Sequence, residues 1–362
     1  MSDFLYTLMV FLVLLTILVF VHEWGHFYVA RRFGVRVEVF SIGFGREIYG
    51  WTDKRGTRWK IAAVPLGGYV KFFGDANAAS MPADDMGGLS REEVREAFPY
   101  KPLYQRAAIV AAGPLINLAF AVLLFAGLYM TSGQPFLTSE ISAVEPGSAA
   151  EAADIRAGDV ITSINDLTIS TFQEMGAAIV ASKCQPLNII IDREGQTLAV
   201  VAVPRLVDAE GKALDRPMLG VRGGGVGYDR LGPFSALYPG TITTGRTMGA
   251  ILVVVGELFR GERSTDELGG PLRIAQISGE AASLGLVSFI RFMALISINL
   301  GLVNLFPIPL LDGGHLMFYG FEALRGKPLG ARMQEIGYMI GFAIVIGLLL
   351  LVTWNDLGAL GL

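Results

Sequence analysis

Four long apolar stretches without charged side chains dominate the pattern of hydrophobic and polar positions along the chain. They cover residues 4–21, 107–130, 292–311 and 336–355. An α-helix needs about 20 mostly apolar residues to cross the hydrocarbon core of a bilayer, so each stretch predicts a transmembrane helix. A fifth apolar stretch, 247–256, is too short for a span and has a charge at each end, which favours an interfacial helix.

The region after the first stretch has a different periodicity. Residues 37–74 alternate apolar with polar side chains and contain several glycines, which predicts β-hairpins. Their aromatic and aliphatic content fits a sheet that dips into the membrane face, and a small cytoplasmic sheet fits it equally well. Residues 75–100 are polar and charged and predict a loop with a short solvated helix.

Residues 138–206 have the pattern of a compact water-soluble domain, with strands predicted at 160–164 and 187–191 on either side of a helix at 172–181. The run from Val144 to Asn165 resembles a PDZ domain of the bacterial, protease-associated kind. Such a domain offers a groove for an added strand or a chain end. One copy is expected, because the residues that follow are too few and too rich in glycine to form a second.

The predicted fold is a polytopic α-helical membrane protein with four transmembrane helices, a membrane-associated β-hairpin sheet and an inserted PDZ-like α+β domain. Its expected segments are the first transmembrane helix (1–36), the β region (37–75), a cytoplasmic loop (76–106), the second transmembrane helix (107–130), the PDZ-like domain (138–206), a linker with the interfacial helix (207–290), the third transmembrane segment (292–315) and the fourth transmembrane helix (336–355).

Composition supports a membrane protein and argues against a nucleic-acid partner. Of 362 residues, 52% are hydrophobic and 17% are charged, well away from an ordinary soluble domain. The net charge of −4 provides no basic surface for holding phosphates. The single cysteine, Cys184, cannot form a disulfide within the chain.

Basic residues between the apolar stretches predict the orientation in the membrane. Those beside the expected cytoplasmic loops are Arg31, Arg32, Arg36, Arg46, Lys101, Arg106, Arg325, Lys327 and Arg332. Both termini and the PDZ-like domain then face the opposite side, the periplasm or exterior of a bacterial cytoplasmic (inner) membrane. The first stretch lacks a basic leader and a small-residue cleavage site, so we expect it to remain as a span rather than to be removed as a signal peptide.

The first predicted span ends in a motif that carries chemistry. Residues 22–26 read His-Glu-Trp-Gly-His and hold two of the chain's three histidines. On a helix, His22 and His26 share one face and can reach the same metal ion, while Glu23 can take a proton from water that the metal makes acidic. Ionisable side chains at the end of a span need a compensating partner. A catalytic zinc site is the preferred interpretation, and an interfacial polar cluster is the alternative.

A catalytic zinc needs a third protein ligand and one open position. The best candidate is Asp312, which follows two prolines that cannot lie within a regular helix, so the backbone there should be extended or unwound and could aim the carboxylate inward. A carboxylate in the turn before Gly313 and Gly314 is the structural alternative. His315, three residues further on, fits a supporting role better than that of a ligand.

Asn117, Asn299 and Asn304 lie in the interior of the predicted spans. Asn117 can donate a hydrogen bond inside the bundle, near the proline kink that follows Gly113, although ordinary helix packing explains this motif at least as well. Asn299 and Asn304 are polar groups at membrane depth that could hold a substrate backbone. Capping of a broken helix explains these two equally well.

Taken together, the motifs at 22–26, 113–117 and 304–314 and the PDZ-like insert resemble the site-2 protease family of M50-type intramembrane zinc metalloproteases. The bacterial RseP-type regulators of σ factor activity are the branch they resemble most. The resemblance implies that His22, His26 and Asp312 bind Zn²⁺, that Glu23 is the general base, and that Asn299 and Asn304 help to hold the substrate.

The resemblance also implies a substrate class and partners. The expected reaction is regulated intramembrane proteolysis of a single-span membrane protein, such as an anti-σ factor already trimmed by an upstream site-1 type protease, or of remnant signal peptides. The sheet at 37–74 would pair with the unwound substrate as an added strand, and the PDZ-like domain would exclude substrates with bulky outer domains. Enterobacterial members have two such domains, so the single domain leaves the stringency of this gate open.

Two other classes of function fit parts of the pattern. A metal transporter also places His and Asp inside the membrane, but here two spans carry ligands and Glu23 has no task in transport. A scaffold with an inert metal site would use only the PDZ-like domain, and the intact Glu23 argues against it.

Overall fold

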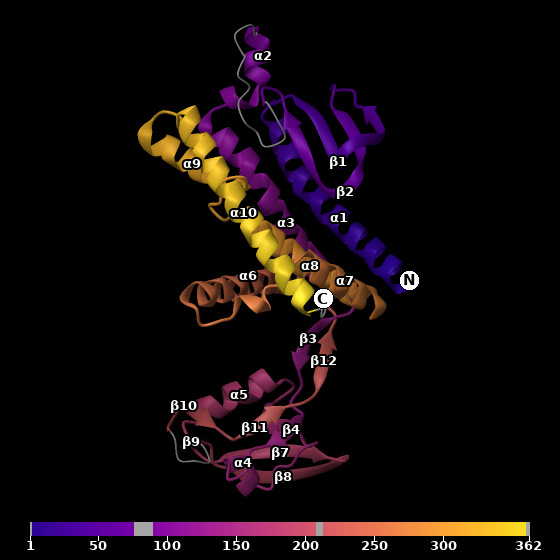
Figure 1. Cartoon of the computed structure of the whole chain (residues 1–362). Coiled ribbons are helices and arrows are strands. Elements are labelled where there is room, and N and C mark those ends of the chain that lie inside the picture. Colours follow the sequence, from indigo (N-terminus) through magenta and orange to yellow (C-terminus); the bar gives the residue numbers. More distant parts are fainter. Residues whose placement is uncertain (1, 76–89, 208–212, 360–362) are drawn as a thin grey trace. The chain divides into compact units, whose positions relative to one another are not determined.

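The computed structural model describes residues 2–75, 90–207 and 213–359. The chain forms two compact units, and Figure 1 follows both of them along the sequence. The first unit combines Met1–Leu128 with Pro233–Leu362, and the second is Tyr129–Gly232. Two segments far apart in the sequence therefore build one body, and the second unit is inserted between them.

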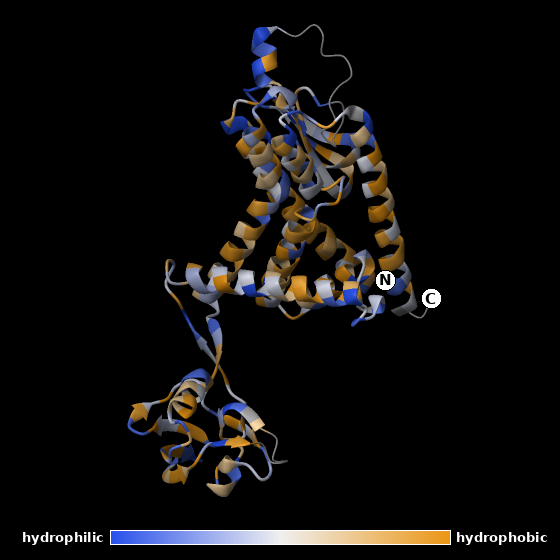
Figure 2. Ribbon diagram, turned by 90° about the vertical axis from the view of Figure 1, so that its left-hand side faces the viewer, coloured by the Kyte–Doolittle hydropathy of each residue, from blue (hydrophilic) through white to orange (hydrophobic). Residues whose placement is uncertain are grey.

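The first unit is mainly helical. Its elements are α1 (Ser2–Arg32), β1 (Val37–Thr52), β2 (Arg58–Phe72), α2 (Arg91–Glu96), a 3-10 turn (Phe98–Tyr100), α3 (Leu103–Thr131), α6 (Leu237–Arg260), a second 3-10 turn (Thr265–Glu267), α7 (Pro271–Ser283), α8 (Leu286–Asn304), α9 (Asp312–Arg325) and α10 (Ala331–Ala359). In Figure 2 the long helices are largely hydrophobic along their length, which is expected of helices that face lipid.

Five helices of the described chain are long and apolar enough to cross a membrane, namely α1, α3, α6, α8 and α10. α1, α3 and α10 contain three of the four stretches that predict spans, and α8 contains the third stretch as far as Asn304. The fifth, α6, has 24 residues, so the stretch 247–256 is part of a much longer helix than its charge-free run suggests. In both views α6 lies across the direction of α3 and α10 (Figures 1 and 2). A crosswise helix fits the predicted interfacial position, and the count of four spans stays a prediction.

The strands β1 and β2 form an antiparallel two-stranded sheet where the alternating pattern predicts hairpins. Aromatic side chains fix this sheet to α1: Phe40 and Trp59 stack with ring centroids 4.4 Å apart, and Phe27 of α1 packs edge-on against both. At the turn between the strands, Asp53 accepts hydrogen bonds from Arg31 of α1 at 2.5 Å and from the Trp59 indole at 3.1 Å. The sheet therefore lies against the last turns of α1.

The third apolar stretch is broken, as its prolines predict. The helix α8 ends at Asn304, and α9 begins at Asp312 after a segment without regular structure. Leu310 in this segment has a positive φ of 99°, in the region that disfavours residues with a side chain. Gly301 of α8 lies so close to the carbonyl of Pro114 that an added Cβ would be 2.9 Å from it. The end of α8, just before the break, therefore packs closely against α3.

The second unit is an α+β domain. Its elements are β3 (Gln134–Leu137), β4 (Ile141–Val144), α4 (Ala149–Ala152), β5 (Val160–Ile164), β6 (Leu167–Thr168), α5 (Phe172–Ala181), β7 (Leu187–Arg193), β8 (Gln196–Ala202), β9 (Arg205–Val207), β10 (Ala213–Met218), β11 (Val221–Gly223) and β12 (Val226–Asp229). The largest sheet has the order β6-β5-β7-β8 and is antiparallel. Its core includes Ile161, Met175 and Ile191.

This unit extends beyond the predicted boundaries 138–206 on both sides. The short strands β10, β11 and β12 return to pair with β9, β4 and β3. Residues 207–231 therefore complete the same unit instead of forming a linker, apart from 208–212, which lie outside the described residues. β11 and β12 are short, contain glycine and pair with strands far back in the sequence, so the local sequence does not reveal them.

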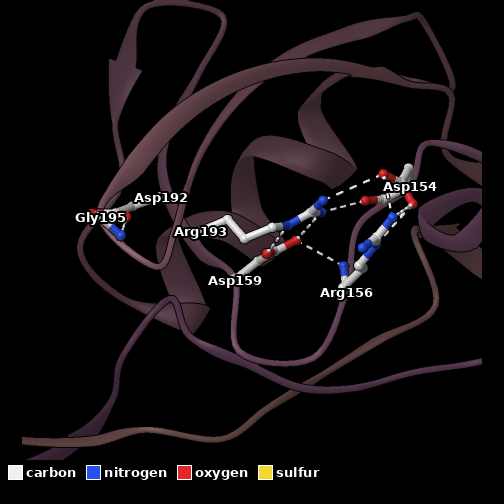
Figure 3. A network of polar contacts seen from close by, with 6 residues as sticks. All are labelled: Asp154, Arg156, Asp159, Asp192, Arg193 and Gly195. Atoms are coloured by element: carbon white, nitrogen blue, oxygen red, sulfur yellow. Dashed lines mark hydrogen bonds and ion pairs between the residues drawn. The ribbon is translucent and has the colours of Figure 1, made fainter.

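A network of charged side chains holds the loop before β5 to the end of β7 (Figure 3). The buried carboxylate of Asp159 accepts hydrogen bonds from the Arg193 guanidinium at 2.8 and 2.9 Å and from the backbone N–H of Arg156 at 2.7 Å. Arg193 also donates to the carbonyl and carboxylate of Asp154. Burial of Asp159 opposes its ionisation, but the hydrogen bonds from Arg193 and Arg156 outweigh this and lower its pKa.

The substitution Asp159→Asn should lower the stability of this unit by an amount that depends on pH. A folded-state pKa below the unfolded value means that the carboxylate stabilises the fold above about pH 4, and that this contribution is lost as the pH falls through the folded pKa. At pH 7 we expect amide exchange of β5 and β7 to be at least about tenfold faster in the variant, because hydrogen bonds to a charged group are lost. Hydrogen exchange, corrected for intrinsic rates, measures this.

The effect should shrink as the pH falls below about 4, because the unfolded carboxylate is protonated first and the folded carboxylate follows at its lower pKa. Glu194→Gln, which neutralises an exposed carboxylate at the turn between β7 and β8, is the control and should exchange like the wild type. Equal exchange of Asp159→Asn and wild type at pH 7 would show that the network does not stabilise the unit.

Candidate metal centre

The two histidines of the 22–26 motif lie side by side near the end of α1. Both are buried, with 9% of His22 and 7% of His26 exposed. Their rings meet edge to face with centroids 4.8 Å apart, and their Nε2 atoms are 3.2 Å from one another. The four-residue spacing on one helix therefore places two nitrogen donors at a single point, as the motif predicts.

Asp312, the first residue of α9, brings an oxygen donor to the same point. Its Oδ2 lies 3.2 Å from His22 Nε2 and 3.5 Å from His26 Nε2. The turn before it is tight, since a Cβ on Gly313 would lie 2.2 Å from the Phe306 carbonyl oxygen and one on Gly314 would lie 2.4 Å from that of Ile308. Two successive glycines thus let the broken segment fold back and direct the carboxylate inward.

The spacing of the three donor atoms fits a zinc ion. Zinc binds imidazole nitrogen and carboxylate oxygen at about 2.0–2.1 Å in tetrahedral geometry, which puts neighbouring donors about 3.3 Å apart. The observed separations are 3.2, 3.2 and 3.5 Å. Among the residues that the structure describes, His22, His26 and Asp312 form a group of converging metal-binding side chains. Three protein donors leave the fourth tetrahedral position open, as in catalytic sites.

The second nitrogen of each histidine has a partner in α3. His26 Nδ1 lies 2.9 Å from the carbonyl oxygen of Ile109, so it carries the proton and leaves Nε2 free for a metal. His22 Nδ1 lies 3.2 Å from the amide of Asn117, whose buried Oδ1 has no hydrogen-bond partner. The two ends of an amide have the same shape, and turning it over lets Oδ1 accept the Nδ1 proton. That arrangement frees Nε2 of His22 as well.

Gly113 of α3 lies in close contact with both histidine rings. A Cβ at this position would lie 2.2 Å from His26 Nε2 and 2.9 Å from His22 Cε1. No side chain larger than hydrogen fits there without moving the donors. Ser297 of α8 donates to the Asn117 carbonyl at 2.8 Å, which fixes this part of α3 from the other side. The histidines are thus oriented by a rigid outer shell.

A cavity of about 170 Å³ adjoins the three donor atoms. Its lining comprises His22, Glu23, His26, Gly68, Tyr69, Val70, Phe72, Val110, Asn304, Leu310, Leu311, Asp312 and His315. Glu23 lies against β2, since an added Cβ on Gly68 would be 3.4 Å from the Glu23 Cγ. A carboxylate beside three converging donors is the arrangement that metal-assisted hydrolysis requires.

The structure brings most of the sequence-predicted residues together. His22, Glu23, His26, Asp312 and Asn304 all line the cavity, whereas Asn299 lies five residues earlier on α8 and outside its lining. His315 also reaches the cavity, and its Nδ1 lies 3.5 Å from the Tyr338 hydroxyl, which fits a supporting role.

Sequence reasoning missed three contacts in α3. The Ile109 carbonyl and the Asn117 amide orient the imidazoles, and Gly113 contacts both rings directly. The four-residue spacing of Gly113 and Asn117, which places both on one helix face, was the available signal. It indicated helix packing and did not show that the histidines are the packed partner.

Comparisons with known proteins agree with this geometry. A family model described as peptidase family M50 matches residues 10–348. A protein of Rhizobium meliloti (strain 1021) named as a zinc metalloprotease is 42% identical, with 97% of this chain and 96% of that protein covered. Metalloprotease MmpA of Caulobacter vibrioides is 35% identical, with 99% and 96% covered.

A more distant relative is longer than this chain. Protease RseP of Yersinia pestis is 31% identical, with 99% of this chain and all of that protein covered, in an alignment of 461 positions against the 362 residues here. The crystal structure of the PDZ domain of an SdrC-like protein from Listeria monocytogenes aligns with 23% of this chain and 84% of its own, at 21% identity and a TM-score of 0.20. That score is too low to carry any conclusion.

Proposed function

The chain belongs to peptidase family M50 and is a membrane zinc metalloprotease, and on this premise we propose that it cuts single-span membrane proteins within the bilayer. In this proposal His22, His26 and Asp312 hold the zinc, Glu23 is the general base, and Asn304 holds the substrate. Asn299 lies outside the cavity lining, so a direct contact with substrate is less favoured for it.

One observation carries the proposal: the three donor atoms lie 3.2–3.5 Å apart, and Glu23 lines the cavity that they adjoin. When bound, zinc supplies Lewis-acid chemistry, because it makes water acidic and polarises a carbonyl group. Glu23 accepts the proton from the attacking water and can return it to the leaving amine.

The strand β2 is suited to present an unwound substrate to this cavity. Its residues 68–72 pair with residues 37–42 of β1, and their other side is an edge of the sheet within the described chain. Gly68, Tyr69 and Val70 line the cavity. Gly68 packs against Val19 and Glu23 of α1, where an added Cβ would be 2.9 Å from Val19 and 3.4 Å from Glu23. An extended peptide added at this edge would expose a bond that a helix hides. Asn304 can then hydrogen-bond to its backbone.

The substrate class follows from the burial of the site. A peptide bond reaches this cavity only from a segment that enters the membrane and unwinds there. A trimmed anti-σ factor, prepared by an upstream site-1 type protease, has this character, and so do remnant signal peptides. The basic residues of the loops favour a periplasmic position for the termini and the PDZ-like unit, and from that side the unit would exclude substrates with bulky outer domains.

Cleavage of a single-span substrate by the purified full-length protein in detergent tests the proposal. We expect a cut within the apolar span that a zinc chelator abolishes and added zinc restores, since the donor set fits zinc. Chelator already saturated with zinc is the control and should leave cleavage intact. A cut that lies outside the span, or that persists in chelator, would contradict the proposal.

A further inference from the structure

An ion pair away from the metal centre joins α3, which orients the two histidines, to α9, which carries Asp312. Arg106, near the start of α3, and Glu322, in the last turn of α9, are 216 residues apart in the sequence. We propose that they are a positioning pair that holds Asp312 in register with His22 and His26. This inference rests on the proposed metal ligands.

The pair has the geometry of a strong interaction. Arg106 Nη2 lies 2.5 Å from Glu322 Oε1, and Nη1 lies 3.2 Å from Oε2, so the contact is bidentate. Each side chain is 14% exposed. Arg106 Nε also donates to the Lys101 carbonyl at 3.1 Å, and the guanidinium lies 4.9 Å from the centre of the Tyr319 ring. These contacts fix both the position and the plane of the guanidinium.

Beyond Tyr319, which packs against the core cluster that contains Phe27 and Phe40, Glu322 is the one described residue in the second half of α9 that is not exposed. The buried residues of α9, Gly313, Gly314 and His315, are all in its first turn. Glu322 lies ten residues after Asp312, about 15 Å along a rigid helix. Rotation or sliding of α9 at the Glu322 end would therefore move the Asp312 carboxylate at the other end.

α3 provides the other side of the pair and already orients both histidines. Ile109 and Asn117 contact their outer nitrogens, and Gly113 lies under the rings. Arg106 precedes these residues on the same helix. The ion pair thus connects the helix that orients two ligands to the helix that carries the third, which is how a supporting shell sets donor spacing.

A second ion pair provides a matched control. Arg36 and Glu96 lie 3.5 Å apart, with 38% and 49% of the two side chains exposed, and neither is on an element that carries or orients a ligand. Glu96→Gln removes one charge in the same way as Glu322→Gln. An exposed pair of this kind contributes little to stability and should not affect the metal centre.

The experiment measures zinc affinity of the full-length protein in detergent by competition with a chromophoric chelator, together with the thermal unfolding temperature. We expect Glu322→Gln and Arg106→Gln each to bind zinc about 10–100-fold more weakly while still folded at the assay temperature. The exchanged pair Arg106→Glu/Glu322→Arg should recover most of the affinity, and Glu96→Gln should bind like the wild type. Asp312→Asn, included as a reference, should lose tight binding.

The outcomes separate this inference from the proposed function. Wild-type affinity in Glu322→Gln, with weak binding in Asp312→Asn, would overturn the positioning role and leave the ligand set intact, even if the unfolding temperature fell. Wild-type affinity in Asp312→Asn would instead overturn the ligand set. If the single variants do not fold, zinc affinity is measured on the variant with the exchanged pair, provided that it folds. Near-wild-type zinc affinity of that variant supports the positioning role, and weak zinc binding contradicts it.

Discussion

Glu23→Gln should reduce cleavage of a single-span substrate by about 10³-fold or more while zinc stays bound. Glutamine has the size and shape of glutamate but cannot accept the proton of the attacking water. Glu23 lines the cavity but is not one of the three converging donors, so its amide leaves the metal ligands in place. The initial rate of product formation measures the loss of cleavage. The zinc content of the same preparation measures whether the metal stays bound.

Measuring both the cleavage rate and the zinc content distinguishes a role of Glu23 in proton transfer from a role in metal binding. A variant that loses both zinc and activity would place Glu23 among the ligands or in the fold of the site instead of in proton transfer. Undiminished cleavage would mean that different chemistry or a contaminating protease makes the cut.

Gly113→Ala should abolish tight zinc binding, with an affinity loss of at least about 100-fold, and cleavage with it. The added methyl group would lie 2.2 Å from the Nε2 donor of His26 and 2.9 Å from His22, so both rings must move. Loss of one outer-shell partner alone typically costs 10–100-fold in affinity, and here both donors shift. Zinc affinity by chelator competition is the measurement.

Gly127→Ala on the same helix is the matched control, because an added Cβ there meets no atom within 4 Å. Alanine is a better helix former than glycine, so neither substitution should weaken α3 itself. The control should bind zinc and cleave substrate like the wild type. Equal zinc affinity in Gly113→Ala and wild type would contradict the observed contact between α3 and the histidines.

Local patterns in the sequence predict much of the membrane unit. The apolar stretches are long enough to mark four of the helices, and the prolines after Asn304 predict the break before Asp312. The spacing of His22 and His26 predicts two donors on one face. These features depend on residues close together in the sequence, so a single chain reveals them.

Contacts between distant segments could not be predicted in the same way. The pairing of β11 with β4 and the ion pair of Arg106 with Glu322 arise only when the chain folds back on itself. Asn117 illustrates the difference: its presence in a span is visible in the sequence, but its contact with His22 is not. The apolar run does not predict the full length of α6, because the charged Arg246 and Glu257 bound the run although both lie inside the helix.

X-ray absorption at the zinc edge of the purified, zinc-loaded protein tests the central claim most directly. A zinc ion held by His22, His26 and Asp312 should show nitrogen and oxygen neighbours at about 2.0–2.1 Å in four-coordinate geometry, with scattering from two imidazole rings. Asp312→Asn should change this spectrum, and Asn299→Ala should not, because Asn299 lies outside the lining of the metal-side cavity. A spectrum with a sulfur neighbour, or with fewer than two imidazoles, would contradict the proposed centre.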